Sequence, residues 1–223
     1  MPIGSDQIRK RLIQLANLTA VDIWIAGVNN NPTFPNAVIQ EVGSDYIRVT
    51  ITSAGTTRNI IVPILPISSI DDVGGAGVTP TIVSRGLRSR LIEFVGDFTI
   101  DIFVTGTTTP AALNVLVTEV GSDYIIGNVG GVNTYLPLTL IAGFRANTAI
   151  TNTPTVNSRD FRDVLVELSA LNSSVIINLG GRVVGTVQAP VNIVEVQSNF
   201  IRLNNSAQTV GTIFWIGSVT RLT

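Results

Sequence analysis

Residues 41–47 read EVGSDYI, and the same seven letters return at residues 119–125. A looser version, EVQSNFI, stands at residues 195–201. We call these three stretches the heptapeptides. Each has an apolar run before it, a Ser-Asp or Ser-Asn step inside it, and an aromatic residue followed by Ile at its end. Such a step between two apolar runs is typical of a hairpin turn. The chain is therefore predicted to use one hairpin three times.

A second repeated feature precedes each heptapeptide. Residues 5–13, 84–92 and 158–166 align with one another, and apolar residues recur in them at helical spacing. Each stretch opens with a serine that can cap a helix: Ser5, Ser84 and Ser158. The sequence therefore predicts a short amphipathic helix at the start of each unit, with these serines as N-caps.

An alternating segment follows each helix. Its apolar positions are Val21, Ile23 and Ile25, then Ile100, Ile102 and Val104, then Val175, Ile177 and Leu179. Alternation of this kind predicts a strand that is buried on one face. In the third copy the alternation lies one place out of phase, which requires a one-residue slip or a bulge.

Each unit closes with another apolar run. The three runs are Val62-Pro63-Ile64, Leu136-Pro137-Leu138 and Phe214-Trp215-Ile216, and seven residues after their central members stand Ile70, Phe144 and Leu222. Proline cannot donate to a strand ladder, so Pro63 and Pro137 are expected at a strand edge or a sharp bend. Trp215 is expected in the corresponding place of the third unit.

These features divide the chain into units at residues 1–73, 80–145 and 154–223, joined by linkers at 74–79 and 146–153 that are rich in Gly, Thr, Asn and Pro. We expect a mainly β protein in which each unit has a short N-terminal helix and about five bent antiparallel strands. Units of this size have thin cores, so stacking three of them in one chain would help to bury apolar surface.

The composition limits the possible functions. The chain has no cysteine and no histidine, which removes disulfides, thiol nucleophiles and the commonest general base and metal ligand. Its net charge is -1 and its arginines are scattered, so no basic patch for a nucleic acid is evident. The longest apolar run, residues 60–67, is far too short to cross a bilayer, and no secretory signal is visible at the N-terminus.

Paired carboxylates are the first candidates for chemistry. Glu41 with Asp45, and Glu119 with Asp123, could act as acid and base or hold a hard cation such as calcium. The third heptapeptide keeps the glutamate as Glu195 but replaces the aspartate by asparagine and the tyrosine by phenylalanine. Because the shape of the turn is kept while the charge and hydroxyl are lost, a structural role is favoured.

Further candidates have similarly competing interpretations. Glu41, Glu119 and Glu195 could gather around a pseudo-threefold axis and bind a cation, although glutamates on a solvated strand face are the ordinary case. A second set recurs in the helices: Arg9, Arg88 and Arg162. These arginines could contact the carboxylates or phosphates of a partner, but a solvated helix face or a bridge between units is favoured.

Two local features lack the context of a binding site. Asp71-Asp72 is an acidic doublet before the first linker, and residues 74–77 are rich in glycine. Neither is followed by the Lys-Ser/Thr of a phosphate loop, so flexibility is the favoured interpretation. No catalytic, cofactor-binding or metal-ligating residue is assigned.

A family resemblance follows from residues 36–51, NAVIQEVGSDYIRVTI, and residues 183–203, which look like the Sm pattern of apolar strand, Asp- or Asn-bearing turn and apolar strand. The closing stretch IIVPILPISSI at 60–70 is similar to Sm-like repeats in spore-coat proteins of bacilli and their relatives. The resemblance implies three tandem Sm-like small β-barrels. RNA-binding Sm proteins carry an Arg-Gly step near the fourth strand. No unit has one between its last two strands, and the Arg-Gly step at 85–86 lies at a helix start.

We therefore expect a non-enzymatic structural protein that self-associates as a spore-coat or outer-layer building block, with itself and other coat proteins as partners. The expected location is the cytoplasm during synthesis and the spore surface afterwards. Sm-like barrels close into rings of six or seven, so two chains of three units would give a six-unit ring. The alternatives are an Sm-like nucleic-acid-binding protein, a phage or capsid accessory protein, and an enzyme that uses carboxylates only, for example on glycans.

Overall fold

The computed structural model describes residues 5–28, 30–129, 131–179, 190–204, 210–213 and 216–221. Within these residues the chain is mainly β, as expected, and its strands join in one sheet. The helices are α1 (Ser5–Leu18), α2 (Leu87–Asp97) and α3 (Phe161–Ala170), and a short 3-10 helix, η1, spans Leu138–Leu140. None of the helices in this part of the chain is long and apolar enough to cross a membrane.

Five strands follow each helix. Unit 1 has β1 (Ala20–Ile25), β2 (Phe34–Val42), β3 (Tyr46–Ser53), β4 (Thr56–Pro63) and β5 (Ile67–Gly74). Unit 2 has β7 (Phe98–Val104), β8 (Ala112–Val120), β9 (Tyr124–Val129), β10 (Val132–Pro137) and β11 (Ile141–Ala149). Unit 3 has β13 (Ser174–Leu179), β14 (Val191–Val196), β15 (Phe200–Asn204), β16 (Val210–Thr212) and β17 (Ile216–Arg221).

The strand order is the same in the three units. In unit 1 the order is β5-β1-β2-β3-β4, with every neighbour antiparallel. Units 2 and 3 repeat this order with their own five strands. Each helix packs against the second strand of its unit, α1 on β2, α2 on β8 and α3 on β14. The repeat that the sequence predicts is therefore present in the strand topology.

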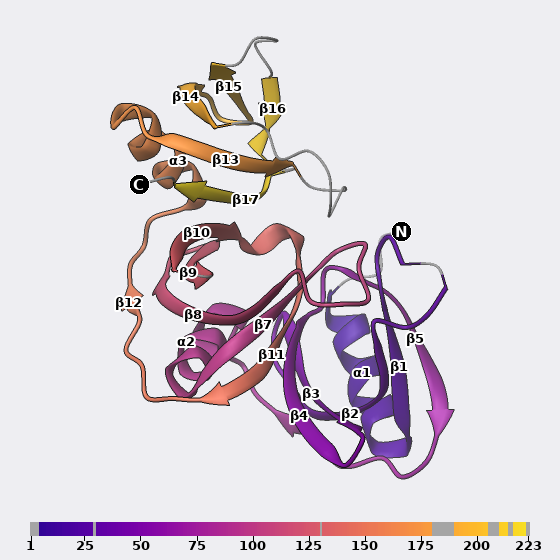
Figure 1. Cartoon of the computed structure of the whole chain (residues 1–223). Helices are drawn as coiled ribbons and strands as arrows, with labels where there is room; N and C mark the ends of the chain where they lie inside the picture. The colour runs from indigo at the N-terminus through magenta and orange to yellow at the C-terminus, as the bar shows by residue number, and fades with distance from the viewer. Residues whose placement is uncertain are drawn as a thin grey trace.

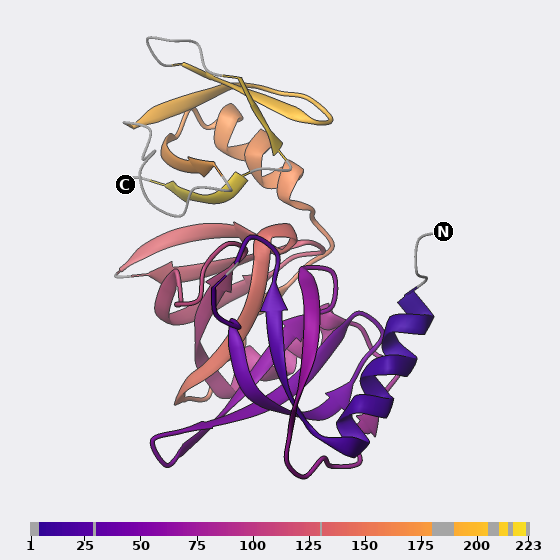
Figure 2. The same cartoon turned by 90° about the vertical axis from the view of Figure 1, so that its right-hand side faces the viewer.

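Strand pairing also joins the units to one another. The fourth strand of each of the first two units pairs antiparallel with the fifth strand of the next, β4 with β11 and β10 with β17. The result is one open sheet in which unit 2 lies between unit 1 and unit 3 (Figures 1 and 2).

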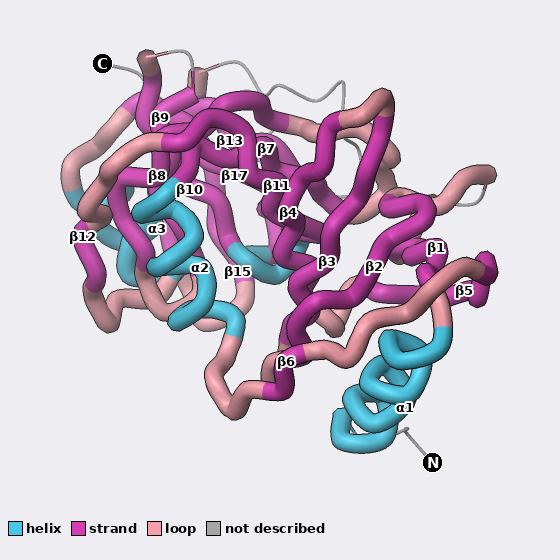
Figure 3. The backbone as a smooth tube through the Cα atoms, turned by 90° about the horizontal axis from the view of Figure 1, so that it is seen from below, coloured by secondary structure: helices cyan, strands magenta, loops and turns pink. Residues whose placement is uncertain are grey.

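The segments between units are bound to the sheet. Two short strands, β6 (Thr81–Ile82) and β12 (Thr155–Val156), pair in parallel with the ends of β2 and β8, respectively (Figure 3). The stretch 146–153, predicted as a linker, is strand as far as Ala149, because β11 continues beside β7. Each connection therefore leads from the fifth strand of one unit to the helix of the next along a fixed path.

Three apolar clusters fill the units, and they interlock. Phe103 of unit 2 belongs to the cluster of unit 1, Tyr46 and Ile61 of unit 1 belong to the cluster of unit 2, and Tyr124 of unit 2 belongs to the cluster of unit 3. Side chains thus cross each boundary between units, so apolar burial is shared between neighbours.

The alternating strands behave differently in units 1 and 2. In β1 the prediction is confirmed, because Val21, Ile23 and Ile25 are fully buried and their neighbours are not. In β7, however, Asp101 and Phe103 are also buried, so the expectation of one solvated face is wrong there. Phe103 is buried by contact with unit 1, where its ring packs edge-on against Phe34, with centroids 5.0 Å apart. Asp101 is covered within unit 2, where Arg145 and Asn147 donate to its carboxylate.

The predicted serine N-caps are corrected by the structure. The N-cap of α2 is Gly86 and that of α3 is Asp160, so Ser84 and Ser158 lie outside the caps. Ser5 is the first residue of α1 itself. Asp160 forms a capping box with Asp163, whereas Gly86 has no side chain to contribute. A hydrogen-bond acceptor for the free N–H groups at the start of α2 therefore has to come from elsewhere in the chain.

The prolines lie where a strand ends and the chain turns, which is one of the two predicted places, and neither lies on an edge strand. Pro63 is the last residue of β4, opposite Tyr46, and Pro137 is the last residue of β10, opposite Tyr124. In unit 3 the residue opposite the heptapeptide aromatic is Thr212, three places before the predicted Trp215. Phe214 and Trp215 lie outside the described residues.

The last strand of unit 3 needs the same correction. Ile70, Phe144 and Val219 each lie opposite an isoleucine of the first strand of their unit, so Val219 fills the place that was predicted for Leu222. Leu222 lies outside the described residues.

The phase shift at the start of unit 3 has a local cause. Val175 and Ile177 are buried, as the alternation predicts. The extra residue is absorbed in the turn between α3 and β13, where Asn172 adopts a positive φ of 48°. Asparagine tolerates this conformation better than most residues, so the strand keeps its register.

Candidate functional site

The heptapeptides form the turns between the second and third strands of the units. The N–H of Gly43 donates to the carbonyl of Tyr46 at 2.9 Å, and Gly121 donates to Tyr124 at 3.0 Å. The third copy closes in the same way, with Gln197 donating to Phe200 at 2.9 Å. The predicted hairpin turn is therefore confirmed in all three copies.

The Ser-Asp step of each of the first two turns binds the start of the next unit's helix. Asp45 Oδ1 accepts the N–H of Leu87, the first residue of α2, at 2.7 Å. Asp123 Oδ1 accepts the N–H of Phe161, the first residue of α3, also at 2.7 Å. A helix N-terminus has unpaired N–H groups and a positive dipole, so a carboxylate there is stabilising. We call each contact of this kind a junction.

The serine of each turn also binds the segment that leads into the next unit's helix. Ser44 donates its N–H and its hydroxyl to the carbonyl of Arg85, at 3.2 and 3.3 Å. Ser122 does the same to the carbonyl of Arg159, at 2.8 and 3.0 Å. The two junctions thus use the same atoms at the same places.

The tyrosine of the heptapeptide crosses the junction. Tyr46 and Tyr124 are fully buried, the first among the side chains around α2 and the second among those around α3. The ring of Tyr124 packs on that of Phe161, with centroids 6.4 Å apart. We call Tyr46, Tyr124 and the corresponding Phe200 the junction aromatics.

Glycine at the third place of the turn is required by the aromatic ring. A Cβ on Gly43 would lie 2.1 Å from the ring of Tyr46, and a Cβ on Gly121 would lie 2.1 Å from the ring of Tyr124. Neither glycine has a positive φ. The requirement is therefore close packing rather than backbone conformation.

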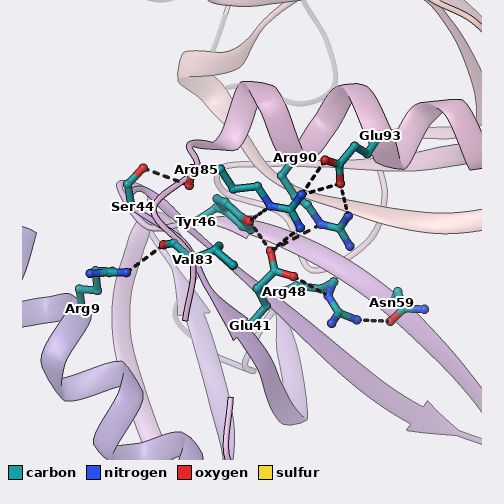
Figure 4. A network of polar contacts seen from close by, with 10 residues as sticks. All are labelled: Arg9, Glu41, Ser44, Tyr46, Arg48, Asn59, Val83, Arg85, Arg90 and Glu93. Carbon is teal, nitrogen blue, oxygen red and sulfur yellow. Dashed lines mark hydrogen bonds and ion pairs between the residues drawn. The ribbon is translucent and has the colours of Figure 1, made fainter. Parts of the chain in front are cut away.

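Glu41 is the buried charge of the first junction. It accepts the hydroxyl of Tyr46 and lies within 3.6 Å of three guanidinium groups, those of Arg48, Arg85 and Arg90 (Figure 4). Arg85 also donates to the Tyr46 hydroxyl at 3.2 Å. The carboxylate is thus paired on several sides, as a buried charge requires.

The pKa values follow from this arrangement. Burial raises the pKa of Glu41, but the Tyr46 hydrogen bond and the three arginines outweigh it, so the pKa lies below its ordinary value of 4.5. Burial and the hydrogen bond to Glu41 raise the pKa of Tyr46 to about 12. The pair is therefore a fixed carboxylate and a fixed phenol at neutral pH.

The second junction uses fewer charges. Glu119 accepts the hydroxyl of Tyr124 and the side-chain amide of Asn157, the latter at 2.7 Å. Burial, together with the Glu119 hydrogen bond, raises the pKa of Tyr124 to about 12. Burial also raises the pKa of Asp123, although the N–H of Phe161 counteracts it.

The recurring helix arginines clamp the connecting segments. Arg9 donates to the carbonyls of Gly43 and Val83, both at 2.9 Å. Arg88 donates to the corresponding carbonyls of Gly121 and Asn157, at 2.6 and 2.5 Å. The interpretation that these arginines bridge neighbouring units is confirmed for Arg9 and Arg88.

Unit 3 has no following unit to bind within the described residues. Arg162 donates to the carbonyl of Gln197 at 3.1 Å, which is the first of the two bonds made by its counterparts. Glu195 pairs with Arg202 at 2.8 Å and accepts from Gln197 at 3.1 Å. Phe200 is half-buried, unlike the other junction aromatics.

The glutamates do not gather around a common cation. Glu41, Glu119 and Glu195 are each held within their own unit's turn and its neighbours. In the part of the chain that the structure describes, no three acidic, histidine or cysteine side chains are placed to hold a metal ion.

The remaining candidates have local roles. Asp72 accepts the hydroxyl of Thr19 at 2.7 Å and the N–H of Gly74 at 2.8 Å, which lower the pKa of Asp72. A pocket of about 480 Å³ lies where the β3–β4 turn meets the β7–β8 loop. Its charged lining residues are Arg58 and Arg145, and none of its lining residues is a carboxylate. Carboxylate chemistry therefore has no basis in this pocket.

Comparisons with known proteins give no guide to function. The chain matches no family model, no curated protein and no solved structure. Sequence reasoning recognised the turn but missed that Asp45 and Asp123 cap the helices of the following units. The sequence offers no short-range signal for this role, because Ser84 and Ser158 suggest caps that are nearer in the chain.

Proposed function

We propose that this chain is a non-enzymatic structural protein that associates with copies of itself. One observation carries this proposal: the same strand interface is used twice inside the chain, and among the described strands its two halves have no partner at the two ends of the series. Ile61 of β4 lies opposite Phe144 of β11, and Tyr135 of β10 lies opposite Val219 of β17. The chain is thus already a linear series of units joined by a repeating contact.

The open ends are two strand edges. Among the described strands, β5 pairs only with β1, and β16 pairs only with β15. In the interior of the chain, the counterparts of these strands pair on both sides. An exposed edge is a template for pairing with another chain. A fourth-strand edge at one end and a fifth-strand edge at the other are the two halves of the contact that joins the units.

The surface chemistry is compatible with close association. Only 13% of the residues are charged, and the net charge is -1. Low net charge removes the repulsion that keeps proteins apart at neutral pH. Buried carboxylates such as Glu41 and Asp101 are paired with arginines, so the charges that do occur are largely used internally.

We further propose that the three units are Sm-like small barrels and that the protein is a building block of a spore coat or similar outer layer. The helix followed by five strands in the order β5-β1-β2-β3-β4 supports the first part. The second part rests on the likeness of residues 60–70 to spore-coat repeats. Other coat proteins are the expected additional partners.

Self-association is tested by sedimentation velocity of the purified chain from micromolar to millimolar concentration, with electron microscopy of the same samples. The proposal expects species heavier than one 23.7 kDa chain and, by microscopy, rings, sheets or fibres. A single 23.7 kDa species over the whole range would contradict it.

A further inference from the structure

Tyr46 and Tyr124 each belong to the apolar cluster of the following unit. Tyr46 packs among Leu87 and Leu91 of α2 and Phe144 of β11. Tyr124 similarly enters the cluster around α3 and β17. Both clusters include residues of the helix and of the fifth strand, so a unit inside the chain receives an aromatic ring from the unit before it.

Unit 1 has a groove at the corresponding place, and none of its lining residues is aromatic. A pocket of about 360 Å³ lies between α1 and β5, lined by Ile8, Leu12, Leu15 and Ile70 together with Arg11 and Asp72. Ile8, Leu12 and Ile70 correspond in the repeat to Leu87, Leu91 and Phe144. Ile8 is 37% exposed where Leu87 is 9% exposed.

Unit 3 has the corresponding aromatic residue, Phe200, and no further unit follows it in the part of the chain that the structure describes. Phe200 is half-buried and does not belong to the apolar cluster of its own unit. Gln197 stands in the place of Gly43 and Gly121, the glycines that leave room for the tyrosine rings at the first two turns. The third turn therefore differs at the place against which the ring packs in the other two.

The charges at the two ends also correspond. In the sequence repeat, Asp6 of unit 1 takes the place of Arg85 of unit 2, so this position of unit 1 does not supply the arginine that pairs with Glu41 and Tyr46 at the first junction. The third heptapeptide has phenylalanine in place of tyrosine and asparagine in place of aspartate, and its Glu195 is paired with Arg202. The changes in the third heptapeptide thus fit the start of unit 1 better than a copy of EVGSDYI would.

A chain cannot fill its own groove. Figures 1 and 2 place β16 and β15 at one end of the molecule and α1 and β5 at the other, with unit 2 between them. The groove and the ring can meet only if they belong to different copies of the chain.

We propose that Phe200 of one copy enters the α1–β5 groove of a second copy, while β16 pairs with β5 of that copy. The register follows the internal contacts, which places Val210 opposite Ile70. This inference rests on the proposed self-association and names its contact. The contact is head-to-tail, so it either closes a ring or continues along a filament.

Two variants separate the two halves of the contact. Ile8→Glu places a charge in the α1–β5 groove and leaves Phe200 and β16 intact. Phe200→Glu removes the aromatic ring and leaves the groove intact. Each variant alone lacks one half, so each is expected to sediment as a single chain. An equimolar mixture of both retains one intact contact and is expected to form a dimer and nothing larger. Leu113→Glu, at a residue that is 62% exposed on β8, is the matched control and is expected to assemble as the wild type does.

The outcomes distinguish this inference from the proposed function. Loss of an aromatic anchor is expected to weaken association by roughly 30-fold or more. If the wild type assembles and both variants assemble equally well, or if the mixture stays monomeric, the inference is overturned while self-association stands. If the wild type is monomeric up to millimolar concentration, self-association itself fails. Circular dichroism checks the folding of each variant, and Phe200→Ala replaces Phe200→Glu if the charged variant does not fold.

Discussion

Gly43→Ala is a small change that tests the packing of the first junction directly. The added Cβ would lie 2.1 Å from the ring of Tyr46, far inside van der Waals contact. Tyr46 is fully buried in the cluster around α2, so its ring cannot move aside without leaving that cluster. Overpacking in a core costs about 1–3 kcal/mol, and losing a buried aromatic costs about 3–5 kcal/mol. We expect Gly43→Ala to lower the free energy of unfolding by about 2–3 kcal/mol.

A double-mutant cycle isolates the cause of that loss. Gly43 does not have a positive φ, so alanine there meets no backbone strain and should gain about 0.4–1 kcal/mol from the unfolded chain. In a Tyr46→Ala background, Gly43→Ala should therefore be neutral or slightly stabilising. Urea unfolding of the four proteins gives the coupling energy. If Gly43→Ala is harmless in the wild type, or equally harmful without the ring, the close contact of ring and glycine is refuted.

The remaining predictions concern the other parts of the junctions. Asp45→Ala should lower the urea midpoint by an amount equivalent to about 1 kcal/mol, because α2 loses the only carboxylate bound to its first N–H in the described residues, whereas Asp45→Asn should cost less. Arg9→Met should lower the free energy of unfolding by about 1–3 kcal/mol, since the carbonyls of Gly43 and Val83 lose their hydrogen-bond donor. Arg162→Met should lower it less, because Arg162 makes one such bond. Equal losses in the two variants would contradict this role of Arg9. The stability that ionised Glu41 contributes should be complete above pH 4.5, the ordinary pKa, and should be lost as the pH falls through the lowered pKa of the folded state. Urea midpoints from about pH 3 to pH 7 should therefore fall less steeply on the acid side for Glu41→Gln than for the wild type, and parallel curves would contradict the assignment.

The sequence allowed the repeat and the hairpin turns to be predicted because both leave local patterns. Letters such as EVGSDYI and the spacing of Val21, Ile23 and Ile25 report turn chemistry and one buried face. The mainly β class and the order of helix and strands follow from the same patterns. Such patterns hold wherever the environment of a segment is set by its own unit.

Predictions failed where a segment distant in the sequence sets the environment. Phe103 and Asp101 look like the solvated face of a strand, yet unit 1 covers Phe103. Asp101 is covered within its own unit by Arg145, which lies on β11. Ser84 looks like a helix cap, but Asp45 of the preceding unit takes that role at α2. No short-range pattern carries this information, since the residues involved lie 42 or more positions apart.

The role of the heptapeptide could be predicted only in part. The comparison of Asp45 with Asn199 and of Tyr46 with Phe200 indicated structure rather than catalysis. The comparison did not reveal that the aspartate carboxylate and the tyrosine ring, which the third copy changes, face the next unit. That conclusion requires knowing which helix lies beside the turn in the folded chain. The third copy differs at the place where the described chain has no further unit.

Engineered cysteines offer the most direct measurement of the head-to-tail contact, because the chain has no cysteine of its own. Residues opposite each other in antiparallel strands have Cα atoms about 4.5–5.5 Å apart, within reach of a disulfide. Under mild oxidation, a chain with Ile70→Cys and Val210→Cys should give covalent species at multiples of the chain mass on a non-reducing gel, and adding Phe200→Glu should abolish them. If the wild type assembles but the cysteine variant stays at the mass of one chain after oxidation, the pairing of β16 with β5 is not the contact between copies.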